Sequence, residues 1–504
     1  MRRPLALLLI TSLGFSLSCN DDDESPAPAA PVATEDPSAF SEIGEISLAG
    51  GEGAAEISAY DATTKKLFVV NNADASRIDV VDIANPASPS FDRFISVSAN
   101  VNSVAVSNGI LAAAVEGANG TDNGLVLFFN TSDFQQIQAV TVGALPDMVT
   151  FSPDGAYAVV ANEGEPNDAY TTDPEGSVSI ITMSDYSVNT LGFGFFASQQ
   201  STLEAGGFRV FGPHASFAQD IEPEYVTISE DSRTAWVSLQ ENNGIARIDL
   251  SGKAITAIFP LGTKDFSQSP DLFDVSDEDN ALQSGAWPVK SFFMPDALAS
   301  FTQGNVSYVV SANEGDARDY DGYSEEARVE DLILDPAIFP EASTLQQADQ
   351  LGRLKITLAQ GNTDQDDEYE ELYAYGGRSF SIWNGATGEL VYDSGNDTET
   401  RVQQNSSLYP DNRSDDKGTE PEGVTVGRIS NRTIAFIGLE RADAVLLYDI
   451  SNPASPTFLQ LLETGDAPEG LLFISAEDSP TGRSLLVVSS EGDGVVKLFE
   501  VGVM

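Results

Sequence analysis

The sequence predicts an all-β protein folded as a β-propeller, and three observations support this fold class. Beyond residue 40, short β-rich runs alternate with Gly, Asn and Asp, and helical periodicity is almost absent. The runs recur in a unit of roughly 45 residues, the period typical of propeller blades. The outer loops of the first and sixth units, Asp82–Pro89 and Asp449–Pro456, are almost identical, which indicates internal repetition.

Composition limits the partners of this chain of 504 residues, 41% of which are hydrophobic, enough for a sizeable core. Lys and Arg total 25 against 78 Asp and Glu, for a formal net charge of −53. That balance repels nucleic acid and anionic lipid headgroups and favours divalent cations. Acidity alone also suits a protein that stays soluble in a salty medium, so the placement of the carboxylates decides between these explanations.

The N-terminus predicts export. Residues 1–18 are typical of a signal peptide, with Arg2 and Arg3 ahead of an apolar stretch, Leu5–Leu17, that is too short to span a bilayer. Cys19 follows a degenerate lipoprotein cleavage box and is the predicted lipid anchor; ordinary secretory cleavage is the alternative. Residues 19–40 form an acidic, Pro- and Ala-rich spacer. We therefore expect a lipoprotein of a bacterial outer membrane or cell surface, on its periplasmic or extracellular face, that meets the membrane only through its lipid.

The repeating units lie in a single domain predicted for residues 41–504. Each unit opens with a short strand that carries a polar, usually acidic, residue, often after proline, and continues with an apolar strand that commonly ends in Glu-Gly. The seven openers are Ala55-Glu56-Ile57, Asn102-Ser103-Val104, Pro146-Asp147-Met148, Pro223-Glu224-Tyr225, Pro295-Asp296-Ala297, Pro421-Glu422-Gly423 and Pro468-Glu469-Gly470. Seven openers predict seven blades.

One segment leaves an eighth blade open. Leu372–Gly376, Ser379–Trp383 and Glu389–Asp393 have strand patterns without an acidic opener. They either complete the fifth blade after an insertion around residues 316–350, which we prefer, or form another blade. The last unit has three obvious strands, so Ile43–Leu48 is expected to supply its fourth and to remove an exposed sheet edge.

The acidic residues of the repeat are expected to converge. In a propeller the innermost strand begins on the face where the second strand ends, so both sets of carboxylates should meet at one mouth of the channel. The openers contribute Glu56, Asp147, Glu224, Asp296, Glu422 and Glu469. The second-strand ends contribute Glu116, Glu163, Glu241, Glu314, Glu440 and Glu491. Strand entry and backbone capping are the alternative roles for these residues.

Carboxylates gathered in this way need positive partners. Two like charges about 5 Å apart repel by about 3 kcal/mol at an effective dielectric constant of 20. Arg318, Arg378 and Arg441 are near these loops and are also possible contacts for an anion, but they are too few to balance the ring. We therefore expect Ca²⁺ or a similar hard cation, which takes several oxygen ligands, with Asp316 as a further ligand.

Two other features carry weaker signals. Asn362–Glu368 alternates oxygen ligands like the start of a calcium loop, but Asp367 stands where the loop has Gly and Tyr373 where it has Glu, so a solvated loop explains it equally well. His214 is the sole histidine, which excludes zinc sites built on histidine and disfavours serine–histidine catalysis.

Several phrases resemble the choice-of-anchor I family. They are Asp147–Glu163, Ser311–Tyr323 (SANEGDARDYDGY), Leu372–Trp383 (LYAYGGRSFSIW), Glu420–Glu440 and Pro468–Glu491. The family includes bacterial surface proteins and is similar to the mesenchyme-specific cell surface glycoproteins of biomineralising animals. The resemblance implies a propeller displayed outside the cell by interchangeable anchors, and its animal members imply calcium association.

Three functions remain open at this stage. The first is a cell-surface, cation-binding propeller, a binding, adhesion or mineral-associated module that takes an extracellular ligand without turnover. The second is a calcium-dependent phosphoesterase, because some bacterial members of the family are labelled alkaline phosphatases; the residues support this poorly, since zinc-binding histidines are lacking and Cys19 serves the anchor. The third is a scaffold with structural ions. The sequence does not give the ligand or the oligomeric state.

Overall fold

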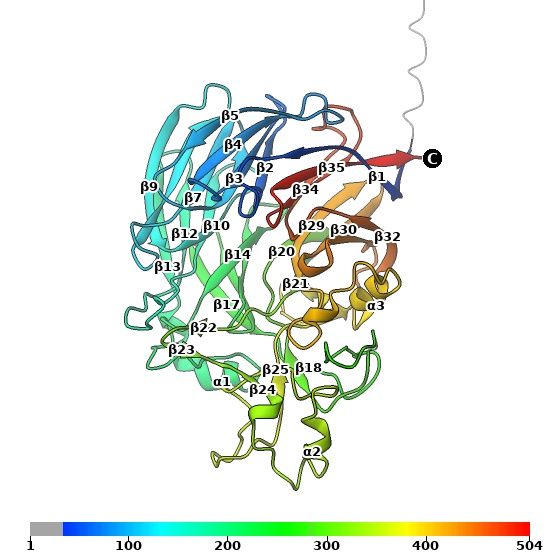
Figure 1. Cartoon of the computed structure of the whole chain (residues 1–504). Helices are drawn as coiled ribbons and strands as arrows, with labels where there is room; N and C mark the ends of the chain where they lie inside the picture. The colour runs from blue at the N-terminus through cyan, green and yellow to red at the C-terminus, as the bar shows by residue number, and fades with distance from the viewer. Residues whose placement is uncertain (1–33, 283) are drawn as a thin grey trace, which may run out of the picture.

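The computed structural model describes residues 34–282 and 284–504. It contains seven four-stranded antiparallel sheets, which lie around a common centre (Figure 1) and confirm the predicted seven-bladed propeller. The innermost strand of each blade contacts the innermost strands of both neighbours, and that of the last blade contacts that of the first. This ring of contacts closes the propeller.

The blades follow one another along the chain. Blades 1 and 2 are β2 (Ser58–Asp61), β3 (Lys66–Asn71), β4 (Arg77–Asp82) and β5 (Ser90–Ser96), then β6 (Val101–Ser107), β7 (Ile110–Val115), β8 (Asn123–Asn130) and β9 (Gln136–Ala144). Blades 3 and 4 are β10 (Pro146–Phe151), β11 (Tyr157–Asn162), β12 (Ser177–Thr182) and β13 (Ser187–Gly192), then β14 (Pro223–Ile228), β15 (Thr234–Leu239), β16 (Gly244–Asp249) and β17 (Ala254–Pro260). Blades 5 and 6 are β20 (Leu298–Gln303), β21 (Val306–Asn313), β27 (Ser379–Asn384) and β28 (Leu390–Asp393), then β29 (Pro421–Ile429), β30 (Arg432–Leu439), β31 (Ala444–Asp449) and β32 (Thr457–Glu463).

Blade 7 joins the two ends of the described chain. It consists of β33 (Pro468–Ile474), β34 (Leu485–Ser490), β35 (Val495–Val503) and β1 (Glu35–Ser47). β1 pairs antiparallel with β35 along almost its whole length, so the pairing starts earlier than the predicted strand at residue 43. The expected closure is confirmed, and it leaves the C-terminal strand without an open edge on that side.

The core lies between the blades. In β3 the run Leu67–Val70 is fully buried, because both faces of each sheet pack against neighbouring blades and an apolar run therefore replaces the alternation of a one-sided sheet. The outer strand β5 is mostly exposed. Burial of these second strands is what holds each opener, one strand further in, at a fixed place around the channel.

A large insertion separates the two halves of blade 5. Between β21 and β27 lie β22 (Asp319–Tyr320), β23 (Tyr323–Ser324), β24 (Glu326–Arg328), α2 (Ala342–Leu345), β25 (Lys355–Thr357) and β26 (Tyr373–Ala374). It has a core of its own with the segment before blade 5, built around Phe266, Phe273 and Leu354. Figure 1 shows α2, β18 (Thr263–Asp265), β24 and β25 together at one end of the molecule.

The preferred seven-blade interpretation holds, with one difference in detail. β27 and β28 complete blade 5, as expected for Ser379–Trp383 and Glu389–Asp393. The segment Leu372–Gly376 instead supplies β26, which pairs with β19 (Lys290–Phe292) in a small three-stranded sheet with β18. The other α-helices in the part of the chain that the structure describes are α1 (Gln200–Glu204) and α3 (Asp397–Gln403).

The predicted signal peptide, Cys19 and most of the spacer lie outside the described residues. Within residues 34–282 and 284–504, no helix has the length and apolar character needed to cross a membrane.

Candidate cation site at the channel mouth

Four of the openers share a break in strand pairing that positions their acidic residues. In β10 the register shifts directly after Pro146, so Asp147 and Met148 lie opposite a single residue of β11. A register shift also follows the prolines that begin β14, β29 and β33. Proline cannot donate to the ladder, and a bulge bends the strand and re-aims a side chain. Asp147 and Glu469 accordingly line the channel.

The second strands deliver their carboxylates to the same end. Glu163, Glu314 and Glu440 directly follow the last residues of β11, β21 and β30. Glu116 and Glu491 follow β7 and β34 in the same way, whereas Glu241 comes two residues after the end of β15. The last residues of β11, β15, β30 and β34 pair with the prolines that begin the adjacent inner strands, as the propeller geometry predicts.

The predicted carboxylates of different blades act on one another across the mouth. Burial, followed by the charges of Glu241, Asp296, Glu163 and Asp147, raises the pKa of Glu224 well above its usual value. The pKa values of Asp296, Glu422 and Glu469 are likewise raised, first by burial, then by the glutamate that follows the second strand of the same blade, and then by carboxylates of other blades. The structure therefore brings the two predicted sets together instead of scattering them over the outer rim.

Several of these groups hold protons near neutral pH. Burial, then the charges of Glu165 and Glu116, raises the pKa of Asp147 to about 7. Burial also raises the pKa of Glu241 to about 8, although Arg318 acts in the opposite direction. Glu56 reaches a pKa of about 7 through burial and the charge of Glu491, despite a hydrogen bond from Asn72. A cation at the mouth would displace these protons.

One sector of the mouth is neutralised by the protein itself. The Lys417 ammonium lies 2.8 Å from Glu314, 3.0 Å from Asp316 and 3.6 Å from Glu420. Arg441 lies 2.6 Å from Glu440 and 3.3 Å from Glu420. Burial would raise the pKa of Glu314, but Lys417 overcomes it and lowers that pKa. Glu314, Glu420 and Glu440 could place ligand oxygens within 4.8 Å of one another, but they are already paired with Lys417 or Arg441.

The neighbouring sector, formed by Glu163, Glu222, Glu224 and Glu241 of blades 3 and 4, has a different balance. Arg318 contacts Glu222 at 2.9 Å, and the described residues form no ion pair with the other three. One oxygen of each of Glu222, Glu224 and Glu241 is buried without a hydrogen-bond partner among the described residues. Glu241 is only 5% exposed. Because a buried carboxylate oxygen without a partner is costly, this sector calls for a proton or a cation.

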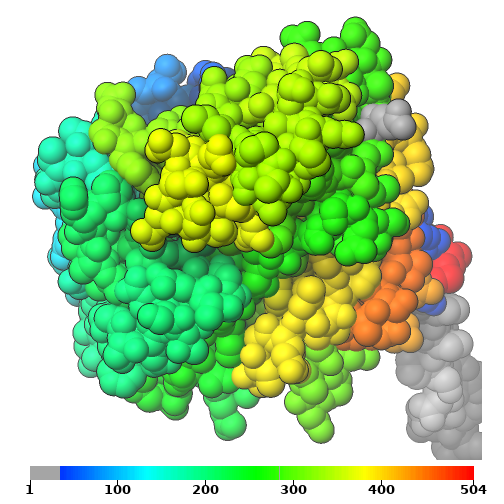
Figure 2. Space-filling view, turned by 90° about the horizontal axis from the view of Figure 1, so that it is seen from below, coloured from blue at the N-terminus to red at the C-terminus, as the bar shows by residue number. Residues whose placement is uncertain are grey.

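The insertion covers this mouth. The Tyr320 hydroxyl donates a 2.8 Å hydrogen bond to Glu165, and its ring packs edge-on against Tyr170 at 5.7 Å. Arg318, 1% exposed, is bound 2.8 Å from Asp220. From that end of the molecule, the yellow-green insertion lies across a large part of the face (Figure 2). The carboxylates therefore lie in a partly closed space where charge interactions are strong.

Of the three arginines predicted as possible anion contacts, two are buried and one is accessible to solvent. Arg318 and Arg378 are 1% and 2% exposed. Arg378 donates to the carbonyls of Asp274, Ser414 and Asp416 and is paired with Glu399, so it fastens the loop before blade 6. Their engagement with protein oxygens argues against direct anion contact. Arg441, with its side chain 41% exposed, keeps access to solvent.

Sequence reasoning missed four residues of the mouth. Glu222 and Glu420 precede the prolines of the fourth and sixth openers, and this Glu-Pro-Glu pattern was a readable signal. Lys417 and Tyr320 had no such signal, because each is hydrogen-bonded to a carboxylate more than 100 positions away in the sequence, Glu314 and Glu165 respectively. The weak calcium-loop signal at Asn362–Glu368 corresponds to an exposed group on the insertion, in which Asp364, Asp366 and Glu370 could approach one ion.

Comparison with known proteins decides the family. The sequence profile of the choice-of-anchor I domain matches residues 56–453. The chain belongs to the choice-of-anchor I family. Its first five blades lie within the matched residues, and so does blade 6 except for its outer strand β32, so the family pattern and the propeller repeat largely coincide.

Two animal proteins are similar to this choice-of-anchor I chain. Gigasin-3a of Magallana gigas is 30% identical over 184 residues, covering 30% of this chain and 64% of the relative. The mesenchyme-specific cell surface glycoprotein of Strongylocentrotus purpuratus is 26% identical over 337 residues, covering 58% of this chain and 41% of the relative. The chain thus matches less than two thirds of the length of either protein. The second relative, by its name, points to a cell-surface setting.

Among solved structures, a Kuenenia stuttgartiensis hydrazine synthase chain is similar in fold. The likeness has a TM-score of 0.50 at 12% identity and covers 90% of this chain and 97% of the other. At that identity it concerns the propeller fold alone.

Proposed function

We propose that this choice-of-anchor I propeller binds Ca²⁺ or a similar divalent cation at its channel mouth and works outside the cell as a binding, adhesion or mineral-associated module without turnover. The observation that carries the proposal is that one buried carboxylate oxygen of each of Glu222, Glu224 and Glu241 has no hydrogen-bond partner in residues 34–282 and 284–504. Hard cations take several carboxylate oxygens at once. The neutralised sector around Lys417 shows how the same ring is balanced elsewhere.

Calcium binding is expected to depend on Glu241. In isothermal titration calorimetry at pH 7.5, Glu241→Gln should weaken Ca²⁺ binding at least about tenfold, because the amide keeps the shape but removes one anionic ligand. The matched control is Glu477→Gln, an exposed glutamate outside the mouth, which should bind as the unaltered chain does. Equal affinity in both variants would assign the ion to another place, and an absence of calcium uptake by the unaltered chain would remove the proposal.

A calcium-dependent phosphoesterase is the second candidate, favoured by the half-exposed Arg441 beside Glu440 and Glu420. An arginine next to carboxylates that hold calcium is suited to a phosphate. We expect no turnover of p-nitrophenyl phosphate with or without Ca²⁺. Calcium-stimulated hydrolysis that is lost in Glu314→Gln and Glu422→Gln would instead establish the enzyme.

We also propose that Cys19 carries the lipid. Cys19→Ser should move the protein from the detergent phase to the aqueous phase in Triton X-114 partition, because the several acyl chains of a bacterial lipoprotein supply the membrane affinity. Incorporation of labelled palmitate should be lost with it. Unchanged partition of the variant would mean that another element holds the protein at the membrane.

A further inference from the structure

The channel contains a cavity of 330 Å³ just inside the carboxylate mouth. Residues at or beside the inner strands of all seven blades line it, and three of them are acidic: Asp147, Asp296 and Glu469. Ligand pockets of proteins start at roughly 300 Å³, so this one suits a small molecule. Because it lies at the axis, every blade can contribute to recognition.

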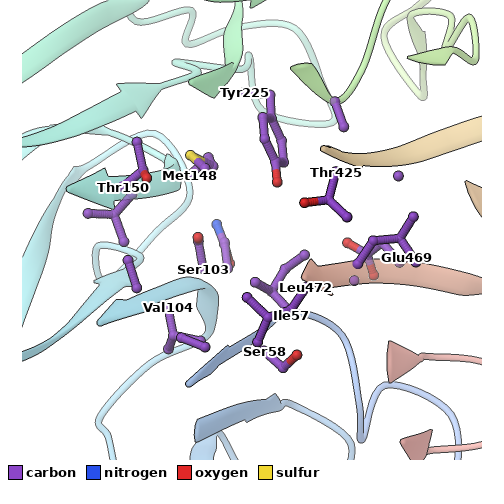
Figure 3. Close-up of a pocket in the computed structure, with 18 of the residues that line it drawn as sticks. Ile57, Ser58, Ser103, Val104, Met148, Thr150, Tyr225, Thr425, Glu469 and Leu472 are labelled. Atoms are coloured by element: carbon purple, nitrogen blue, oxygen red, sulfur yellow. The ribbon is translucent and has the colours of Figure 1, made fainter. Parts of the chain in front are cut away.

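The cavity wall combines charge with apolar surface. Figure 3 shows Met148 and Thr150 on one side, Thr425 and Glu469 on the other, and the Tyr225 hydroxyl directed toward the middle. Ile57, Val104 and Leu472 complete an apolar wall. In the described part of the chain, no lysine or arginine forms an ion pair with any of the three acidic residues. The cavity is therefore lined by acidic groups without a cationic partner and is partly apolar.

A second observation, a buried hydroxyl group on the cavity wall, points to a polar ligand. Ser58 lines it, is 8% exposed, and its hydroxyl has no hydrogen-bond partner among the described residues. Buried hydroxyl groups are normally bonded to protein or to something held beside them. A ligand with hydrogen-bond donors at one end and carbon at the other matches this wall.

The ring already shows how it accepts an ammonium group. Lys417, whose side chain is 11% exposed, places its Nζ among Glu314, Asp316 and Glu420. An ammonium group with a short carbon stem thus fits between carboxylates of this propeller. A hard divalent ion would need several oxygens within about 2.6 Å and would gain nothing from Met148, Ile57 and Leu472.

We propose that the channel cavity binds a small primary amine, with its ammonium group at Asp147, Asp296 and Glu469 and its aliphatic part against Ile57 and Met148. Entry is from the pole away from the insertion. There a second cavity of 390 Å³ shares Tyr60, Val106 and Leu472 with the first and lies at the turns between inner and second strands. The amine site thus differs from the calcium sector in position and in chemistry.

The test compares n-butylamine with 1-butanol, which has the same carbon chain and no charge, by isothermal titration calorimetry on the purified full chain. Saturable binding of n-butylamine, at least about tenfold tighter than that of 1-butanol, is the expected result, because a charged partner in a buried site contributes well over the 1.4 kcal/mol of a tenfold change. Equal binding of the two compounds, or binding of neither because the cavity holds only water, would overturn the proposal.

Variants localise the site and separate it from calcium binding. Asp296→Asn and the cavity-filling Met148→Trp should each weaken n-butylamine binding at least about tenfold, while Glu477→Gln leaves it unchanged. Glu241→Gln, which is aimed at the calcium sector, should weaken n-butylamine binding much less than Asp296→Asn does. Calcium binding without amine binding would remove this inference alone, whereas amine binding without calcium binding would remove only the proposed cation function.

Discussion

Without divalent cations, the melting temperature of the protein should fall by on the order of 5 °C between pH 5 and pH 8, and calcium should abolish that fall. The groups responsible have folded-state pKa values raised by burial and by one another, as in Asp147 at about 7 and Glu241 at about 8. In the unfolded chain such carboxyls titrate near pH 4. Above that pH the folded state binds more protons than the unfolded state, so stability falls as pH rises through the folded pKa values.

Differential scanning fluorimetry with a chelator, and then with excess Ca²⁺, measures this dependence. A shift of about three pKa units, as for Asp147, corresponds to roughly 4 kcal/mol. The double variant Asp147→Asn, Glu241→Gln should show a clearly smaller fall without calcium, because two of the groups no longer ionise. A melting temperature that rises from pH 5 to pH 8 in chelator would show that the carboxylates at the mouth are stabilised as anions by other means.

Replacing Arg318 with methionine should cost about 3–5 kcal/mol of unfolding free energy. The guanidinium is 1% exposed and pairs with Asp220 at 2.8 Å and Glu222 at 2.9 Å, which are also buried. Its removal leaves two carboxylates without their cation in a water-poor site. Chemical denaturation monitored by tryptophan fluorescence measures the loss.

The controls for Arg318 separate charge from packing. Arg432→Met breaks a half-exposed pair with Asp449 at 3.6 Å and should change stability by less than about 1 kcal/mol. Adding Asp220→Asn and Glu222→Gln to Arg318→Met should restore part of the lost stability, since the orphaned charges are then gone. No recovery in that triple variant would assign the loss to the stacking of the Arg318 guanidinium on the Phe211 ring, 4.5 Å from its centroid.

Much of the fold was predictable because propeller blades repeat. Each opener, such as Pro146-Asp147-Met148, and each second strand, such as Leu67–Val70, carries its own local pattern, and seven copies fixed the number of blades. Closure by β1 followed from a missing fourth strand. The insertion was harder to predict, because it has no repeat to align with and makes its core with residues before blade 5, such as Phe266.

The carboxylates of the mouth could be predicted from the sequence, whereas the cationic and polar groups that contact them could not. Glu224 and Glu241 belong to the repeat, so their convergence follows from blade geometry. Lys417 lies 103 positions from Glu314, and Tyr320 lies 155 positions from Glu165. The loop before blade 6 and the long insertion therefore decide which of these carboxylates gain a partner. Local pattern cannot report such contacts.

The amino-acid sequence by itself determined an acidic, seven-bladed, end-closed propeller whose carboxylates face one opening, because strand pattern and period are local properties of the chain. Only the tertiary structure decided that Lys417 and Arg441 neutralise one sector of that opening, and that buried oxygens of Glu224 and Glu241 in the neighbouring sector have no partner in the part of the chain that the structure describes. The physical reason is that charge balance depends on distance in space and on burial, and both are set by contacts between segments far apart in sequence.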